Sequence, residues 1–134
     1  LSTKNYDQAD IILTGVSRSG KTPTCLFLAL QYGIYAANYP LIDEDLDSVK
    51  LPSVLKPFKK KLYGLSINPV RLQNIRGERR SNSGYASIEQ CQKEVRRAED
   101  MYVQNNVPFI DTSHISIEEI AGRILQKSKL ERRY

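Results

Sequence analysis

Apolar positions along the 134-residue chain follow two periods in turn, one typical of strands and one typical of helices. Short, nearly continuous apolar runs bounded by turn residues predict strands. Stretches with apolar residues every three or four positions predict helices with one buried face. The expected strands are 10–14, 34–38, 61–67 and 107–111, and the expected helices are 26–32, 51–56, 69–80, 88–104 and 117–127. Strands separated by helices predict an α/β fold with a mostly parallel sheet and helices on both faces.

Residues at the expected helix ends support these helices. Ser87 and Ser116 each stand three positions before a glutamine or glutamate, which is the spacing of a capping box. Asn68 is a good capping residue, and Pro69 fits the first position of a helix, where no backbone N–H is needed. Gly33 is suited to end the first long helix. The sequence leaves the order of the strands in the sheet open.

The segment between the first strand and the first helix, residues 15–22, matches the phosphate-binding pattern G-x-x-x-x-G-K-[ST] in its strand–loop–helix context. Gly15 and Gly20 let the backbone curl so that N–H groups and the positive helix end face an anion. Lys21 would reach the outer phosphates, and the Thr22 hydroxyl would hold Mg²⁺. The alternative, a chance glycine turn with a surface lysine, is disfavoured because both flanks match. The expected nucleotide-binding residues are Gly15, Val16, Ser17, Arg18, Ser19, Gly20, Lys21 and Thr22.

Residue 23 departs from the usual form of this loop because it is proline. The N–H at this position commonly helps to hold the innermost phosphate, and proline has no N–H. Pro23 fits the first helical turn sterically but removes one donor from the loop. Either the nucleotide is shifted or another group holds the inner phosphate. A nucleotide held mainly by its outer phosphate would lose least.

The expected helix 69–80 carries arginines that suggest phosphoryl transfer. Arg76 and Arg80 are four positions apart and Arg79 is three from Arg76, so the three lie near one face. An arginine face that closes over a transferring phosphate is one interpretation, and a solvated basic face is the other. The expected catalytic residues are Lys21, Arg76, Arg79 and Asp111.

Other candidate residues carry weaker signals. Asp111 ends the last expected strand and could hold Mg²⁺ through water, or it could cap the turn that follows. His114 is the one histidine and lies in a polar loop, where a histidine is usually only a solvated side chain. The acidic residues between positions 43 and 47 are typical of a solvated loop, although one of them could act as a base toward an acceptor hydroxyl. The sequence does not identify the catalytic base.

Charge and cysteine content narrow the class of partner. The formal net charge is +5, with basic clusters at 56–61, 71–80 and 132–133. No aromatic-interleaved RNA motif or zinc-finger spacing accompanies this charge. Nucleotide phosphates and an acidic protein surface explain it at least as well as nucleic acid, which we do not expect as a partner. Cys25 and Cys91 lack metal-ligand spacing and are expected to be reduced packing residues.

The length fits one domain, and apolar residues at 40% are enough to fill one core. No apolar run is long enough to span a membrane and no signal-peptide pattern is present, so we expect a cytoplasmic protein without a membrane partner. The chain begins with Leu, which suggests a fragment. We expect residues 1–8 to be a polar lead-in, residues 9–130 the domain and residues 131–134 a basic tail. The sequence leaves a homo-oligomer open.

Six segments together resemble one protein family. They are GVSRSGKTPT at 15–24, AANYP at 36–40, GLSINPVRL at 64–72, IRGERR at 75–80, YAS at 85–87 and SIEEI at 116–120. The chain is similar in these segments to the bacterial phosphoenolpyruvate synthase regulatory proteins, which are relatives of the plant pyruvate, phosphate dikinase regulatory protein. The likeness covers nearly the whole chain from about residue 9 onward, and DTSH at 111–114 departs from the Asp-Val-Thr common in the family.

The resemblance implies a bifunctional phosphotransferase with a P-loop nucleotide-binding domain. Members of the family phosphorylate a threonine of phosphoenolpyruvate synthase with ADP, which inactivates the synthase. They also remove that phosphate with inorganic phosphate and release pyrophosphate. The implied ligands are ADP or ATP, inorganic phosphate and Mg²⁺, and the implied partner is phosphoenolpyruvate synthase. Family members are longer, and this chain matches their C-terminal half, so the piece alone is not assumed to be active.

Two other classes share the same sequence features. A P-loop kinase of a small metabolite or nucleoside would have the same loop and arginine face but no protein target. A nucleotide-binding module without activity of its own fits if the rest of the protein supplies the catalytic base. A regulatory GTPase is disfavoured because no Asn-Lys-x-Asp guanine motif occurs.

Overall fold

The computed structural model describes residues 3–80 and 84–129, with the backbone alone at residues 3–4 and 79–80. Within these residues, one parallel sheet has the strand order β2-β1-β3-β4. Its strands are β1 (Ile11–Gly15), β2 (Ala36–Pro40), β3 (Leu62–Ser66) and β4 (Phe109–Asp111). The α-helices are α1 (Thr3–Gln8), α2 (Lys21–Tyr32), α3 (Asp43–Leu46), α4 (Pro69–Arg80), α5 (Ile88–Gln104) and α6 (Ile117–Ser128). The 3-10 helices are η1 (Ser53–Lys61) and η2 (Gly84–Ala86).

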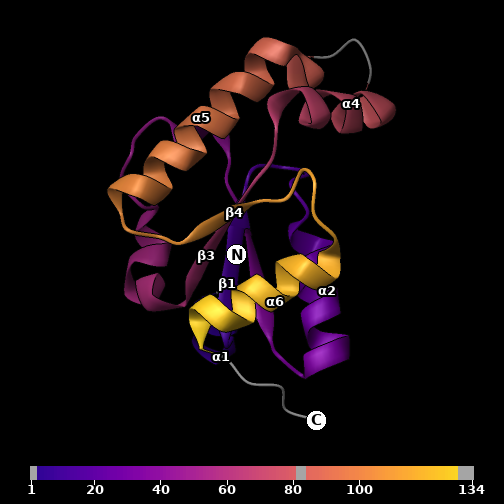
Figure 1. The fold of residues 1–134 in the computed structure, drawn as a ribbon. Helices are drawn as coiled ribbons and strands as arrows, with labels where there is room; N and C mark the ends of the chain where they lie inside the picture. Colours follow the sequence, from indigo (N-terminus) through magenta and orange to yellow (C-terminus); the bar gives the residue numbers. More distant parts are fainter. Residues whose placement is uncertain (1–2, 81–83, 130–134) are drawn as a thin grey trace.

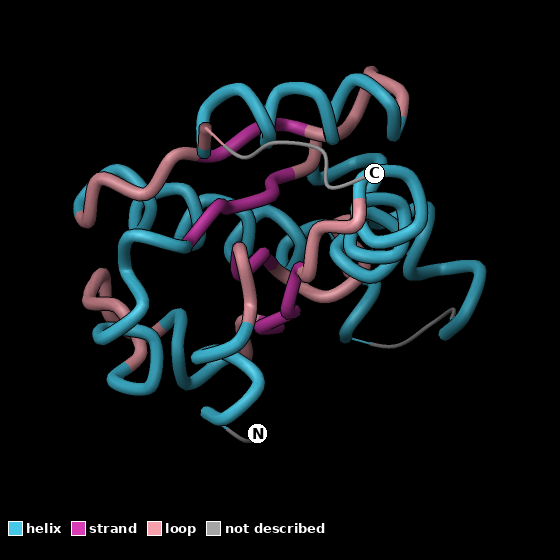
Figure 2. Tube along the Cα trace, turned by 90° about the horizontal axis from the view of Figure 1, so that it is seen from below, coloured by secondary structure: helices cyan, strands magenta, loops and turns pink. Residues whose placement is uncertain are grey.

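The helices form two layers around the sheet. Helices α4 and α5 pack together on one side, and α2 and α6 pack together on the other (Figure 1). The view turned by 90° shows the strands running between these helical layers (Figure 2). Because the strands are parallel, their carboxyl ends lie along one edge of the sheet, where α/β proteins commonly bind ligands.

Side chains of β1 alternate between two hydrophobic cores. Ile12 packs in the core that α5 covers, whereas Ile11 and Leu13 pack in the core that α6 covers. All 5 residues of β1 are buried, and so are all 5 of β3. A parallel sheet covered on both faces needs such strands. This explains why the central strands read as almost continuous apolar runs without polar alternation.

Tyr102 fastens α5 to the two central strands. Its hydroxyl lies 2.9 Å from the Leu65 carbonyl oxygen and 3.1 Å from the Thr14 carbonyl oxygen, and it donates toward both. A Cβ atom at Gly64 would lie only 2.6 Å from the Tyr102 ring, so glycine alone permits this approach. Thr14 directly precedes Gly15, and the contact therefore fixes the strand end from which the glycine loop starts.

The expected order of strands and helices is confirmed, with small shifts at the element ends. Ser87 and Ser116 each accept the backbone N–H three positions later at 3.1 Å. The Asn68 side chain accepts the Val70 N–H at 2.9 Å at the start of α4. Gly33 ends α2 in the left-handed conformation with φ of 66°. The capping residues identified in the sequence therefore do cap these helices.

Residues 3–8 differ from the expected polar lead-in because they form α1. Tyr6 on this helix is only 2% exposed, and its ring packs against the rings of Tyr39 and Phe58. A single aromatic residue in a polar segment gives no helical period, so the sequence pattern missed this contribution to the core. The segment is part of the packed domain.

Two further segments are more ordered than expected. The acidic segment forms α3, where the Asp45 carboxylate accepts the Ile42 N–H at 3.1 Å and the Tyr39 hydroxyl at 3.2 Å. The short helix expected before Pro57 is a 3-10 helix that continues through it to Lys61, with non-helical φ and ψ at Phe58. The expected break at 81–84 falls largely outside the described residues, and Gly84 opens η2.

The structure also bears on the expectations about membrane spans and cysteines. Among the described helices, none combines the length and the apolar character that crossing a membrane requires. Cys25 and Cys91 are both free thiols, as expected; Cys91 is buried and Cys25 is half-buried.

Candidate functional site

Residues 15–22 form the loop that joins the carboxyl end of β1 to the start of α2 (Figure 1). Arg18 and Gly20 both have left-handed backbone conformations, with φ of 71° and 100°. Glycine adopts this conformation without steric cost, which explains the second glycine of the motif. Helix α2 begins at the next residue, Lys21. The strand–loop–helix arrangement expected from the sequence is therefore confirmed.

Carbonyl groups of the loop are held by side chains from other parts of the chain. The Ser17 carbonyl accepts from Arg76 Nη2 at 3.1 Å, and the Ser19 carbonyl accepts from Thr112 Oγ1 at 3.2 Å. A trans peptide directs its N–H opposite to its C=O, so the following N–H in each case points away from these partners. Within the described residues, neither N–H donates to a protein acceptor. Both donors are therefore available to an anion.

Lys21 lies inside the loop with only 5% of its surface exposed. Its Nζ donates to the Val16 carbonyl at 2.6 Å. Burial, and secondarily the positive charge of Arg76, lower the pKa of Lys21 to about 8. Among the described residues, no carboxylate pairs with Lys21. A phosphate oxygen would supply the opposite charge that the described residues do not provide.

Thr22 is exposed at the start of α2, and its Oγ1 accepts a hydrogen bond from Asn38 Nδ2 at 3.1 Å. The other amide atom, Asn38 Oδ1, is buried without a partner in the described part of the chain. Both oxygens are of the kind that Mg²⁺ prefers. The described residues contain no group of three or more His, Cys, Asp or Glu that could hold a metal. The residues therefore fit Mg²⁺ only together with phosphate oxygens of a nucleotide.

Two adjoining depressions lie beside the loop. The first has a volume of about 280 Å³ and is lined by Arg18, Gly20, Lys21, Thr22, Pro23 and Ile75. The second, of about 290 Å³, shares four of these residues and continues over Ile67, Ile115, Ile117 and Ile120. The basic first depression suits phosphate groups. The apolar wall of the second is of the kind that receives the base or sugar of a nucleotide.

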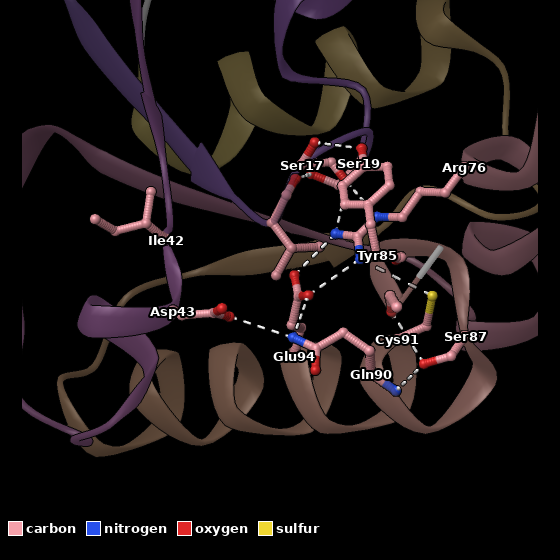
Figure 3. A network of polar contacts seen from close by, with 12 residues as sticks. Ser17, Ser19, Ile42, Asp43, Arg76, Tyr85, Ser87, Gln90, Cys91 and Glu94 are labelled. Atoms are coloured by element: carbon pink, nitrogen blue, oxygen red, sulfur yellow. Dashed lines mark hydrogen bonds and ion pairs between the residues drawn. The ribbon is translucent and has the colours of Figure 1, made fainter. Parts of the chain in front are cut away.

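Arg76 lies in the interior of the protein, with 0% of its surface exposed. Its guanidinium pairs with the Glu94 carboxylate of α5 at 2.8 Å and stacks on the Tyr85 ring with 4.3 Å to the ring centroid (Figure 3). The alternative of a solvated basic face is therefore wrong for Arg76. The side chains of Arg79 and Arg80 fall outside the described residues, and the catalytic role expected of Arg79 stays a prediction.

Asp111 lies at the carboxyl end of β4, and it does not line either depression beside the loop. Its Oδ1 accepts the Ser113 N–H at 2.8 Å, as in the turn-capping alternative. It lines a separate depression of about 450 Å³ between the ends of β3 and β4 and helix α5. His114 is exposed. The catalytic role of Asp111 stays a prediction.

Sequence reasoning did not identify three residues that contact the loop, or Glu94, which holds Arg76; the three are Tyr85, Thr112 and Asn38. Glu94 left a usable signal, because it lies directly beside Val95 in the apolar stripe of α5, where a carboxylate needs a buried partner. Thr112 and Asn38 left no such signal in the sequence. Their contacts depend on which strand ends lie beside the loop, and the strand order was open.

Comparison with known proteins identifies the family of the chain. The model of the kinase/pyrophosphorylase family matches residues 1–125. The chain belongs to the kinase/pyrophosphorylase family. A relative from Neisseria gonorrhoeae (strain NCCP11945), named "Putative phosphoenolpyruvate synthase regulatory protein", is 59% identical over 134 residues, which cover 100% of this chain and 49% of the relative. A relative of the same name from Legionella pneumophila (strain Corby) is 56% identical over 133 residues, covering 99% of this chain and 49% of the relative.

Another relative of that name, from Laribacter hongkongensis (strain HLHK9), is 59% identical over 131 residues. These residues cover 98% of this chain and 48% of the relative. The chain thus spans about half the length of the curated relatives that it matches. The family match includes the whole of the loop around Lys21.

Proposed function

We propose that the protein containing this chain phosphorylates a threonine of phosphoenolpyruvate synthase with ADP and later removes that phosphate with inorganic phosphate. In the first reaction, the threonine oxygen bonds to the β-phosphorus of ADP, and AMP and a proton are released. In the second reaction, an oxygen of inorganic phosphate bonds to the phosphothreonine phosphorus. The threonine oxygen leaves and takes up a proton, and pyrophosphate is the other product. The first reaction switches the synthase off and the second restores it.

The loop around Lys21 is the observation that carries this proposal. Its buried ammonium group pairs with no carboxylate in the described residues, and it lies beside a basic depression of about 280 Å³. Both reactions need a site that binds two linked phosphates, because ADP enters in one direction and pyrophosphate leaves in the other. Pro23 supports such a site, since it removes the donor that an inner phosphate commonly uses.

The residues of the loop take distinct roles in this proposal. Lys21 contacts the transferred phosphate and offsets the charge that spreads over its oxygens in the transition state. The free N–H groups of the loop orient the diphosphate. Thr22 would hold Mg²⁺, and that ion, when bound, supplies further neutralisation of phosphate charge. Arg79 is proposed to contact the phosphate from the end of α4.

The protein partner rests on the names of relatives and not on a surface of this chain. The relatives carry a name that refers to phosphoenolpyruvate synthase, and this chain spans about half of their length. ADP dependence, the threonine acceptor and a cytoplasmic location shared with the synthase are therefore parts of the proposal.

The test incubates phosphoenolpyruvate synthase with this chain, and in parallel with the full-length Neisseria gonorrhoeae relative. ADP labelled at its β-phosphate and ATP labelled at its γ-phosphate are supplied separately. We expect labelled phosphothreonine with ADP, and its loss with formation of labelled pyrophosphate when inorganic phosphate is added. Label that appears only with ATP, or only on a small metabolite, would contradict the proposal. Transfer by the relative without transfer by this chain would identify the chain as its nucleotide-binding half.

A further inference from the structure

We propose that the buried pair Arg76–Glu94 is a positioning device for the phosphate-binding loop. Arg76 holds the Ser17 carbonyl, and the N–H that follows it in the chain, that of Arg18, is thereby aimed at the ligand phosphate. Arg76 acts through the loop backbone and does not touch the transferred phosphate. The inference rests on the proposed function, because it concerns the residues that prepare the same site.

All five N–H groups of the Arg76 guanidinium have protein acceptors. Nε and Nη2 donate to the Ser17 carbonyl at 3.3 and 3.1 Å. Nη1 and Nη2 donate to the two carboxylate oxygens of Glu94 at 3.1 and 2.8 Å, and Nη1 also donates to the Tyr85 carbonyl at 3.0 Å. An arginine side chain has five donors and no acceptor. Arg76 therefore has no donor left for a phosphate oxygen.

The segment around Tyr85 contacts the same part of the loop. The Tyr85 hydroxyl and Ser17 Oγ are 2.7 Å apart, and the Tyr85 ring stacks against the Arg76 guanidinium (Figure 3). Ser17 is thus held through both its backbone carbonyl and its side chain. The contacts come from two elements, α4 and η2, that are far from the loop in the sequence.

Glu94 is itself held in place by a chain of contacts that reaches α3. Gln90 Nε2 donates to Glu94 Oε2 at 2.7 Å and to Asp43 Oδ1 at 3.2 Å (Figure 3). The carboxylate of Glu94 also offsets the positive charge of Arg76, which lies close enough to Lys21 to lower the pKa of that lysine. The pair therefore keeps a guanidinium beside the loop without leaving a second unpaired cation there.

The energetic cost of this arrangement points to positioning more than to stability. Burying an arginine and a carboxylate removes both from water, and apolar residues of the same volume often stabilise a protein equally well. An apolar pair, however, has no donor for the Ser17 carbonyl. That peptide would then be free to turn its carbonyl oxygen toward the ligand, where it would repel a phosphate instead of donating to it.

The test replaces the pair by apolar residues of similar volume, Arg76→Met with Glu94→Leu, in the 134-residue chain. The matched control is Glu119→Gln with Arg123→Gln, which removes the same two charges from an exposed pair on α6 whose atoms lie 2.7 Å apart. We measure the melting temperature, the amide signal of Arg18 in nitrogen-15 NMR spectra, and ADP affinity by calorimetry. The charge-retaining variant Arg76→Lys is measured in the same way.

We expect the Met–Leu variant to fold with a melting temperature close to that of the parent chain. We also expect a shifted Arg18 amide signal and ADP affinity lower by about tenfold, which is the loss of one hydrogen bond to a charged group. Arg76→Lys should show the same shift and weakened binding, because a lysine cannot hold Ser17 and both oxygens of Glu94 together. The control should match the parent chain in all three measurements.

An unchanged Arg18 signal and unchanged ADP affinity in the folded Met–Leu variant would overturn the inference. If that variant does not fold, Arg76→Lys decides by the same two measurements. If the parent chain binds no ADP, the proposed function fails, and the Arg18 signal still decides whether the pair positions the loop. The two proposals can therefore fail separately.

Discussion

The loop after β1 and the depression after β4 both lie at carboxyl ends of parallel strands, yet they are built differently. In the loop, side chains anchor the Ser17 and Ser19 carbonyls and the buried Lys21 carries positive charge. The depression is lined by three carboxylates and one arginine: Glu99, Asp100, Asp111 and Arg96. The loop suits an anion of defined geometry, whereas carboxylates in the depression would repel one.

In the proposed function the loop binds phosphate and the depression does not, so a position at a carboxyl end would not be enough to make a phosphate site. The backbone N–H groups must be aimed by holding the carbonyls that precede them, and the local charge must be positive. The loop meets both conditions because α4, α5 and the end of β4 all contribute side chains around it. The depression after β4 is larger, at about 450 Å³, but its three carboxylates outnumber its one arginine.

The largest expected effect concerns the buried anchor of the loop. Arg76→Ala leaves the buried Glu94 carboxylate without its charged partner, so the free energy of unfolding should fall by about 3–5 kcal/mol. Urea denaturation measures the change.

The control is Arg97→Ala, which breaks an exposed pair between α5 and Asp47 at the end of α3. It should change the same quantity by less than about 1 kcal/mol. Equal losses in the two variants would contradict the contrast between the anchored loop and the open depression.

Lys21→Ala should lower ADP affinity by about hundredfold, because it removes the cation that faces the phosphates. The fold should persist, since no carboxylate in the described residues depends on Lys21. Calorimetry measures the affinity, and the melting temperature reports the fold. Arg96→Ala, on the depression side, is the matched control and should leave ADP affinity unchanged. An equally large loss in Arg96→Ala would place the nucleotide in the depression after β4 and contradict the proposed site at the loop.

ADP affinity should fall as the pH rises above about 8. The pKa of Lys21 is lowered to about 8 mainly by burial, so the unliganded loop loses its proton there. Bound phosphate favours the charged form, so binding above this pH requires uptake of a proton and weakens by up to about tenfold per pH unit. Phosphate groups lose their last proton near a pKa of about 6 and do not titrate in this range.

The same shift has a defined consequence for stability. Because the pKa of Lys21 is lower in the folded chain than its ordinary value of 10.5, the unfolded chain binds more protons between about 8 and that value. Stability should therefore rise with pH from about 8 to about 9, above which the pKa of Cys25, raised by burial to about 11, has the opposite effect. Lys21→Arg is the control. Because arginine stays charged, this variant should lose the pH dependence of ADP affinity and the pH dependence of stability that Lys21 causes. A pH profile of Lys21→Arg identical to that of the parent chain would assign the effect to another group.

The smallest expected effect is that of Asp111→Asn on nucleotide binding. Asparagine keeps the Oδ1 acceptor that bonds the Ser113 N–H, and Asp111 lines the depression instead of the loop. ADP affinity should change by less than about twofold, as measured by calorimetry. A tenfold loss would contradict the separation of the two regions. Loss of phosphoryl transfer at constant affinity would support the catalytic role expected from the sequence.

The parts of the fold that local sequence determines were predictable. The strands, the capping residues and the glycine loop depend on neighbours within a few positions, so each carries its own pattern. Tyr6 was missed because its burial depends on Tyr39 and Phe58, which are distant in the chain. The same reason explains why the sequence left two interpretations of Arg76 open: helical spacing predicts a shared face but does not say what covers it.

The site was predictable only where it coincides with the motif. Lys21 and the loop glycines follow from spacing. Thr112, by contrast, contacts the loop at Ser19 from 93 positions further along the chain, and Glu94 contacts Arg76 from 18 positions further along. Their contribution depends on α5 packing beside α4 and on β4 lying next to β3. Such contacts require the strand order, which the sequence of one chain leaves open.

The close contact of Tyr102 with Gly64 also limits how this protein can change over time. Any side chain at position 64 would collide with the ring, since even a first carbon atom would lie 2.6 Å away. A smaller residue at position 102 would leave a void and lose the hydroxyl between the Thr14 and Leu65 carbonyls. Replacing either residue alone would therefore destabilise the fold. In the descent of this family, the two positions should therefore have been inherited as a unit and replaced together or not at all.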